Sequence, residues 1–168
     1  MPVTRLNHAV LYVRDAARTA AYYREVLGFR VVFEMAGGQA IFLQAPGSTN
    51  DHDLGLFTIG EGAGPSAAGR STVGLYHIAW EVDTLDELAQ VAGRLVERGS
   101  LVGSTDHGTT KALYARDPDG LEFEVSWLVP AALITEDMRM RMAPLDIEAE
   151  RARFGGGTRG GVGVSVPA

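Results

Sequence analysis

Residues 105–124, TDHGTTKALYARDPDGLEFE, bring three side chains that can move protons or bind metals into one short stretch. These are His107, Tyr114 and Glu124, and they flank the sequence DPDG, which is typical of a tight turn. The alternating apolar residues on either side of DPDG predict two strands joined by this turn. A hairpin that carries an imidazole, a phenol and a carboxylate can transfer protons or contribute metal ligands.

Two of the four histidines occupy matching places in two similar segments. His8 in LNHAVLYV and His77 in LYHIAWEV are each the third residue of an apolar, strand-like run. In LEFEVSW, alternation puts Glu124 and its neighbour Glu122 on one face and the large apolar residues on the other. The same rule turns Tyr76 toward the core. We therefore expect His8, His77 and a glutamate to meet where two sheets pair into an open cup.

Two histidines and one carboxylate leave several coordination positions of a metal ion free. Such a ligand set suits iron(II) enzymes, which bind a substrate and dioxygen on the same ion. Zinc-dependent hydrolysis is possible with the same ligands, but no serine, cysteine or second carboxylate is placed to assist it. Glu122 shares the face of Glu124 and is its rival for the carboxylate position.

The elements that must position these residues follow one scheme twice: a strand, a helix and then three strands. In the first half, Asp15 is placed to cap a helix that ends at Gly28. In the second half, Thr84 and Glu87 form a predicted capping box at the start of the helix. The predicted fold class is α+β, with two βαβββ modules that form an open, cup-shaped mixed sheet.

The chain is expected to divide into a body and a tail. The predicted parts are a single domain at 1–128 (modules 3–60 and 73–128, linker 61–72), a C-terminal helical extension at 129–153 and a flexible Gly-rich tail at 154–168. In the extension, methionines alternate with arginines at Met138, Met140 and Met142. We expect this segment to face a partner.

The composition excludes several classes of function. Fifteen basic against 21 acidic residues give a net charge of −6, and Lys111 is the only lysine, so a nucleic-acid partner is not expected. The absence of cysteine excludes disulfides, zinc fingers and thiol nucleophiles. No apolar run approaches the length of a membrane span, and no basic-then-apolar leader opens the sequence. We expect a cytoplasmic protein whose partner is a small organic molecule or another protein.

The doubled strand–helix–three-strand unit resembles the vicinal oxygen chelate superfamily, which includes glyoxalase I, bleomycin- and fosfomycin-resistance proteins and extradiol dioxygenases. The resemblance covers residues 3 to 128. In that superfamily the metal ligands come from the first strand of each unit and the last strand of one unit. The resemblance therefore implies His8, His77 and Glu124 as metal ligands, and the spacing from Gly120 favours Glu124 over Glu122.

The opening stretch is similar to the signature of type I extradiol ring-cleavage dioxygenases. The signature is a histidine, an apolar residue followed by tyrosine, Asp-Pro-x-Gly and a glutamate, matched here by His107, Leu113-Tyr114, Asp117–Gly120 and Glu124. The segment DHDLGLF resembles the one that carries the acid–base histidine of that family, which implies this role for His52.

The resemblance implies a dioxygenase of aromatic catabolism that cleaves a catechol-type aromatic diol beside its two hydroxyls, with O2 as the second substrate. The implied cofactor is Fe(2+), with Mn(2+) as the alternative. His52 is expected to donate a proton during ring opening, His107 to hold a substrate oxygen, and Tyr114 to bind or deprotonate a hydroxyl.

Two rival functions share the fold. One is a glyoxalase-like isomerase, epimerase or thiol transferase, although these usually need a further metal-binding Glu or Gln where this sequence offers His52. The other is a non-catalytic, drug-binding resistance protein, which usually lacks the three metal ligands. The familiar extradiol enzymes carry four units and this sequence carries two, so the tail or a neighbouring subunit is expected to close the pocket. We expect a homodimer or a higher homo-oligomer.

Overall fold

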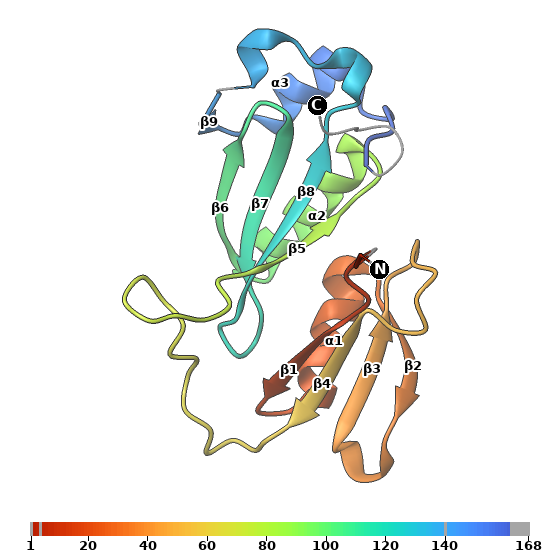
Figure 1. Cartoon of the computed structure of the whole chain (residues 1–168), viewed down its shortest axis with the longest axis vertical. Helices are drawn as coiled ribbons and strands as arrows, with labels where there is room; N and C mark the ends of the chain where they lie inside the picture. Colours follow the sequence, from red (N-terminus) through yellow and green to blue (C-terminus); the bar gives the residue numbers. More distant parts are fainter. Residues whose placement is uncertain (1, 4, 140, 162–168) are drawn as a thin grey trace. The chain divides into compact units, whose positions relative to one another are not determined.

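The computed structural model describes residues 2–3, 5–139 and 141–161, and it divides the chain into two compact units (Figure 1). The first unit consists of the chain up to Ala67 together with the turn Asp117–Gly120. The second consists of Ala68–Arg116 and the chain from Leu121 onward. Each unit is built around its own sheet.

The first unit has one helix and four strands. They are β1 (Ala9–Val13), α1 (Ala16–Leu27), β2 (Arg30–Glu34), the short 3-10 helix η1 (Ala36–Gly38), β3 (Ala40–Gln44) and β4 (Leu54–Thr58). The sheet has the order β1-β4-β3-β2, in which β1 and β4 are parallel and the other pairs are antiparallel. This is the predicted βαβββ module.

Helix α1 covers one face of this sheet. Asp15 caps its first turn by accepting hydrogen bonds from the backbone N–H groups of Ala17 and Arg18. Gly28 ends it with φ +76°, a left-handed conformation that favours glycine. The helix buries Tyr22 and Tyr23 against the sheet, where Leu43, Leu54 and Leu56 are fully buried. Each such leucine stabilises the fold by about 1.5–3 kcal/mol.

The turn Asp117–Gly120 is also part of the first unit. Asp119 has a side chain that is only 5% exposed, and it accepts hydrogen bonds from Arg14 at 2.8 Å and from Arg18 at 3.1 Å. Gly120 has φ +84°, as the predicted turn requires. Two guanidinium groups therefore compensate the charge of Asp119, the second of the two aspartates in the DPDG turn.

The second unit repeats the module with a longer sheet. Its elements are β5 (Ile78–Glu81), α2 (Leu85–Glu97), β6 (Leu101–Asp106), β7 (Thr110–Arg116) and β8 (Glu122–Leu128). The sheet has the order β5-β8-β7-β6-β9, in which β9 (Ala143–Pro144) comes from farther along the chain and β5 and β8 are parallel. The predicted capping box is present, since Thr84 and Glu87 exchange hydrogen bonds at the start of α2.

Helix α2 buries one apolar stripe against this sheet, formed by Leu85, Leu88, Val91 and Leu95. On β8, Phe123, Val125 and Trp127 are buried, as the alternation in LEFEVSW predicts. One orientation was predicted wrongly: Tyr76 is 69% exposed and not in the core. The strand begins only at Ile78, so alternation does not extend to Tyr76.

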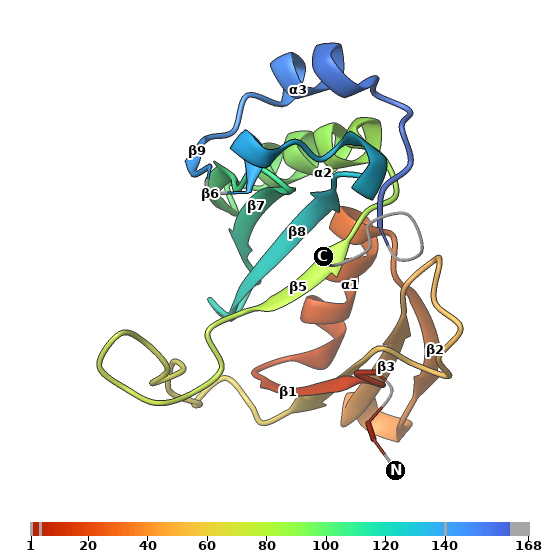
Figure 2. The same ribbon diagram turned by 45° about the horizontal axis from the view of Figure 1, so that its top comes forward.

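After β8 the chain forms short elements that remain with the second unit (Figure 2). They are η2 (Ala131–Leu133), η3 (Glu136–Met138), β9 (Ala143–Pro144) and α3 (Ile147–Phe154), and α3 packs beside α2. Met138 is fully buried, so the prediction of a partner-facing side chain is wrong at this position. Met142 is 77% exposed, and Met140 lies outside the described residues.

The last described residues contact the second unit. The indole N–H of Trp127 donates to the carbonyl of Thr158 at 3.1 Å, and Arg159 binds Asp83 at 2.7 Å. The predicted Gly-rich tail includes 162–168, which lie outside the described residues.

A buried ionic cluster fastens these C-terminal elements to the hairpin β6–β7. Lys111 is fully buried and binds Asp106 as well as Glu150 of α3, the latter at 2.9 Å. Arg141 binds the other oxygen of Asp106 at 2.7 Å. Two cations and two carboxylates balance one another, which is the condition under which charges can be buried.

The α+β class and the two βαβββ modules predicted from the sequence are confirmed. Among the helices that the structure describes, none combines the length and the apolar composition needed to cross a bilayer.

Candidate metal centre and its neighbours

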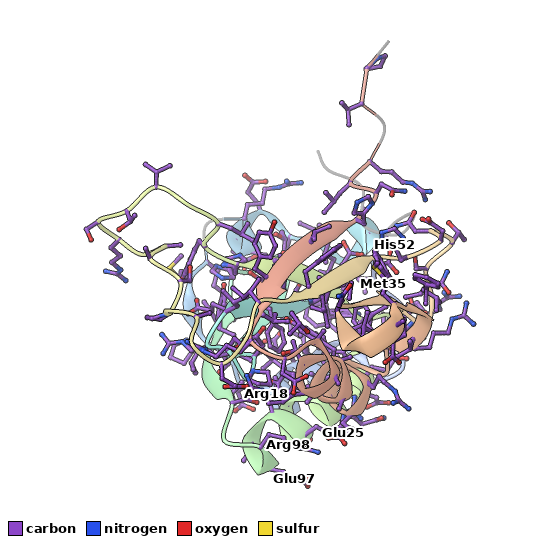
Figure 3. The ribbon with its side chains drawn as sticks, turned by 90° about the horizontal axis from the view of Figure 1, so that it is seen from below. Arg18, Glu25, Met35, His52, Glu97 and Arg98 are labelled. Carbon is purple, nitrogen blue, oxygen red and sulfur yellow. The ribbon has the colours of Figure 1, made fainter. Side chains whose placement is uncertain are left out.

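The first unit brings His8 and His52 together. His8 directly precedes β1, His52 is separated from β4 by Asp53, and these two strands are parallel neighbours. Their ring centroids are 4.4 Å apart. Figure 3 labels His52 at the end of the first sheet. The parallel register of β1 and β4 therefore places the two imidazoles side by side.

Each of these imidazoles is held at one nitrogen by its preceding residue. His8 Nδ1 lies 2.7 Å from Asn7 Oδ1, and His52 Nδ1 lies 3.2 Å from Asp51 Oδ2. The backbone N–H of His52 is the largest cause of an Asp51 pKa below its usual value. A hydrogen bond at Nδ1 fixes the tautomer and directs Nε2 to a metal or a substrate.

The second unit brings His77 and Glu124 together. His77 directly precedes β5, and Glu124 on the parallel neighbour β8 pairs with Ala79. His77 Nε2 lies 3.3 Å from Glu124 Oε2. A charge-assisted hydrogen bond would be shorter, about 2.7–2.9 Å. Two donor atoms about 2.1 Å from one ion, at a right angle, are roughly 3 Å apart. The pair therefore has the spacing of two ligands of one metal ion.

The other ring nitrogen of His77, Nδ1, is buried and has no hydrogen-bond partner in the described part of the chain. Unlike His8 and His52, this imidazole is therefore not oriented through Nδ1. The donor set of imidazole nitrogen and carboxylate oxygen is one that iron(II) and manganese(II) both accept. The residues present fit such an ion.

Tyr114 and His107 adjoin this pair. Tyr114 lies opposite Glu124 in the antiparallel pairing of β7 and β8, and its hydroxyl is 2.9 Å from His107 Nε2. Burial and then the negative charge of Glu124 raise the pKa of Tyr114 to about 12. The ring of Tyr114 also lies 5.9 Å from that of His77. A carboxylate, two imidazoles and a phenol therefore form one cluster in the second unit.

The six predicted site residues thus fall into two groups, one in each unit. The second unit gathers His77, Glu124, Tyr114 and His107, and the first gathers His8 and His52. Within the described ranges, neither unit alone supplies three His, Asp or Glu side chains arranged to hold a metal. The complete three-ligand set stays a prediction. Glu122, by contrast, lies 3.7 Å from the guanidinium of Arg116.

Sequence reasoning missed the residues that orient the histidines. Asn7 and Asp51 each precede a candidate histidine, and both supply the oxygen nearest its Nδ1. Phe42 was also missed, although its ring meets that of His52 edge-on at 5.1 Å. A polar residue beside a candidate histidine was a usable signal for the first two. Phe42 had none, because only the strand register brings it there.

Comparison with known proteins agrees with this architecture. Residues 5–125 match the family described as the Glyoxalase/Bleomycin resistance protein/Dioxygenase superfamily. The chain belongs to this superfamily, as the sequence resemblance predicted. A solved glyoxylase/bleomycin resistance protein/dioxygenase domain from Frankia sp. EAN1pec has a TM-score of 0.62 at 21% identity, covering 74% of this chain and 92% of that one. At 21% identity, the similarity to this solved structure shows a shared fold.

Two relatives in the superfamily are named as dioxygenases. Catechol-2,3-dioxygenase from Bacillus subtilis (strain 168) is 34% identical over 73% of this chain and 41% of its own length. Biphenyl-2,3-diol 1,2-dioxygenase 3 from Rhodococcus globerulus is 35% identical over 71% of this chain and 62% of its own. The chain therefore spans less than two-thirds of the length of either relative.

Proposed function

We propose that this protein is an extradiol dioxygenase that inserts O2 into a catechol-type aromatic diol at a single Fe(2+) ion, with Mn(2+) as the alternative metal. His8, His77 and Glu124 would hold the ion. The observation that carries the proposal is the 3.3 Å separation of His77 Nε2 and Glu124 Oε2, with a proton-transfer pair beside it. The names of the two relatives support the same reaction class.

The bound metal would supply Lewis acidity toward the diol and electron transfer to dioxygen. The chain's own residues would handle protons. Tyr114 would meet a substrate hydroxyl at its phenolic oxygen. His107, whose Nε2 lies 2.9 Å from the Tyr114 hydroxyl, would hydrogen-bond a substrate oxygen and keep it oriented. His52 would use Nε2 to give a proton during ring opening, since its Nδ1 faces Asp51.

The test is anaerobic loading with iron(II), followed by a panel of catechols in air-saturated buffer. The expected result is a yellow ring-opened product with one O2 consumed per diol. Parallel samples loaded with manganese, zinc or nickel identify the active metal. Iron-loaded protein that binds catechol but consumes no O2 would contradict the proposal. Isomerisation of a thiol adduct by the nickel- or zinc-loaded protein would favour the glyoxalase-like rival.

A homodimer or higher homo-oligomer, a cytoplasmic location and a role in aromatic catabolism remain predictions that accompany this proposal.

A further inference from the structure

The chain beyond β8 lies outside the superfamily match, which ends at residue 125. We call residues 129–139 and 141–154, which run from the end of β8 to the end of α3, the C-terminal segment. Several of its contacts fall on the turn that joins β6 to β7. His107 is the first residue of that turn. The C-terminal segment therefore touches the part of the second unit that carries a proposed catalytic side chain.

The C-terminal segment holds both sides of this turn through the backbone. On one side, strand β9 pairs with the end of β6 at Asp106 (Figure 1). On the other side, the N–H of Val129 donates to the carbonyl of Thr109 at 2.9 Å. The turn itself is closed by a hydrogen bond of 2.9 Å from the N–H of His107 to the carbonyl of Thr110. The turn thus fixes the backbone of His107, and the C-terminal segment fixes the turn.

Gly108, directly after His107, is covered by the same segment. It has φ +78°, and a Cβ there would lie 1.7 Å from the carbonyl oxygen of Met138 and 3.3 Å from the Cβ of Arg141. The contact therefore requires glycine both for its conformation and for the space. Because Met138 is fully buried, moving it aside would expose apolar surface.

The side chain of Asp106 joins the segment to the turn by charge. It is buried, and its Oδ1 accepts hydrogen bonds from Lys111 and, at 2.8 Å, from the N–H of Gly108. Its Oδ2 binds Nε of Arg141 at 2.7 Å. One carboxylate therefore connects a guanidinium of the C-terminal segment to the residues on both sides of His107.

The position of the turn matters because His107 Nε2 lies 2.9 Å from the hydroxyl of Tyr114. Tyr114 is held within the sheet by the pairing of β7 with β8. A displacement of the turn by about 1 Å would take the two atoms beyond hydrogen-bond distance. The contacts of the C-terminal segment oppose such a displacement.

We propose that the C-terminal segment positions His107 for catalysis, and that Arg141, acting through Asp106, is a positioning residue for it. This inference rests on the proposed function for the part that His107 plays in turnover. It assigns a role in the reaction to residues that lie beyond the superfamily match.

The test compares Arg141→Gln with Arg139→Gln in the full-length, iron-loaded protein. The two arginine side chains are 44% and 45% exposed, but Arg139 pairs with the exposed Glu136 at 3.6 Å and not with Asp106. Arg141→Gln should lower kcat for catechol by about tenfold or more, since small misplacements of orienting groups slow reactions to this extent. Its iron content should be unchanged. Arg139→Gln should change kcat by less than about twofold, as expected for a surface pair. Arg141→Lys keeps the charge and should restore part of kcat.

Gly108→Ala and Gly99→Ala form a second matched pair. Both glycines have positive φ, +78° and +63°, so both substitutions strain the backbone. A Cβ on Gly99 would have no described atom within 4 Å, apart from its chain neighbours. Gly108→Ala alone would push the C-terminal segment away, and it alone should lower kcat as Arg141→Gln does. Thermal unfolding of both variants measures the strain that they share.

A readout without metal separates this inference from the proposed function. In the metal-free protein, the ring protons of His107 and Tyr114 should show a nuclear Overhauser effect, because the ring centroids are 6.5 Å apart and the hydroxyl is close to Nε2. The effect should weaken in Arg141→Gln and persist in Arg139→Gln.

The outcomes distinguish the two proposals. If the Overhauser effect responds as expected and the wild type cleaves no diol, the positioning of His107 is supported and the dioxygenase proposal fails. If the wild type cleaves catechol and Arg141→Gln keeps both its kcat and the Overhauser effect, the inference fails alone. In an active protein the inference also fails if Arg141→Gln changes only one of these two quantities.

Discussion

Glu124 and Glu122 stand two residues apart on one face of β8, yet their surroundings differ. Glu124 meets His77 at 3.3 Å, and Glu122 meets Arg116 at 3.7 Å. A carboxylate beside an imidazole shares its position with a second possible metal ligand, whereas one beside a guanidinium is already compensated by a cation. At the scale of single residues, this difference assigns the ligand role within a pair that sequence alone left as rivals.

Replacing each glutamate in turn tests that assignment. Glu124→Gln removes the anionic donor beside His77 and should weaken iron(II) binding by at least about 100-fold. Loss of a group that only supports a metal ligand already weakens metal binding by up to about 100-fold, and Glu124 is proposed as a ligand itself. Glu122→Gln should change the affinity for iron(II) by less than about threefold, as expected for the loss of a charge paired at the protein surface. Anaerobic competition with a chromophoric chelator measures both. Equal losses in the two variants would remove the basis for choosing Glu124.

The hydroxyl of Tyr114 is the second residue-scale test. Tyr114→Phe deletes the group that His107 contacts and leaves the ring in place, so metal content should be unchanged while kcat falls by about 10²–10⁴-fold. Tyr76→Phe removes the hydroxyl of an exposed tyrosine beside His77 and should change kcat by less than about threefold. Stopped-flow turnover of a simple catechol gives both values. Full activity in Tyr114→Phe would exclude a proton-handling role.

At the scale of elements, the C-terminal segment is attached to the second unit by buried charge. Asp106 and Lys111 lie on the two strands of one hairpin, and Glu150 comes from α3. Gly108 in the same hairpin approaches the carbonyl of Met138 so closely that a Cβ would lie 1.7 Å from its oxygen. The segment after β8 thus belongs to the structure that supports His107.

Glu150→Gln should destabilise the second unit by about 3–5 kcal/mol, because it leaves a buried cation without one of its two anions. The matched control is Glu148→Gln on the same helix. Glu148 is 76% exposed and pairs with Arg151 at the surface, so its loss should cost less than about 1 kcal/mol. Urea unfolding followed by tryptophan fluorescence measures the difference, since Trp80 and Trp127 both lie in the second unit. A cost at Glu150 as small as at Glu148 would show that the cluster contributes little.

At the scale of the whole molecule, the same cluster predicts an acid limit. Burial alone would raise the pKa of Asp106, but hydrogen bonds from Lys111 and Gly108 outweigh it and hold the pKa below its usual value. A carboxyl whose pKa is lower folded than unfolded contributes stability above the unfolded value, about 3.9, and loses it as pH falls through the folded value. Unfolding free energy should therefore decline below about pH 4. Asp106→Asn should flatten this decline, and an unchanged slope in that variant would refute the assignment.

The sequence was sufficient for most of this architecture, because local signals agree with the fold. Strand alternation, the cap at Asp15 and the glycine at Gly28 each act over a few residues, and the doubled pattern reinforces them. Tyr76 was placed wrongly because it precedes its strand, and side chains alternate between the two faces only within a sheet. The ionic cluster was missed because segments that are distant in the sequence create it. His8 and His77 were found from their matching places in the two halves, the role of His52 came from the resemblance, and the structure adds the contacts of their rings.

The complete burial of Lys111 has a practical consequence, since it is the only lysine in the sequence. Reagents that acylate primary amines have no lysine target on the native surface, and can modify only a chain-terminal amine. When the second unit opens, that single ammonium group becomes accessible. Brief exposure to such a reagent, followed by mass spectrometry, would therefore count the molecules in which this unit is open, without any engineered label.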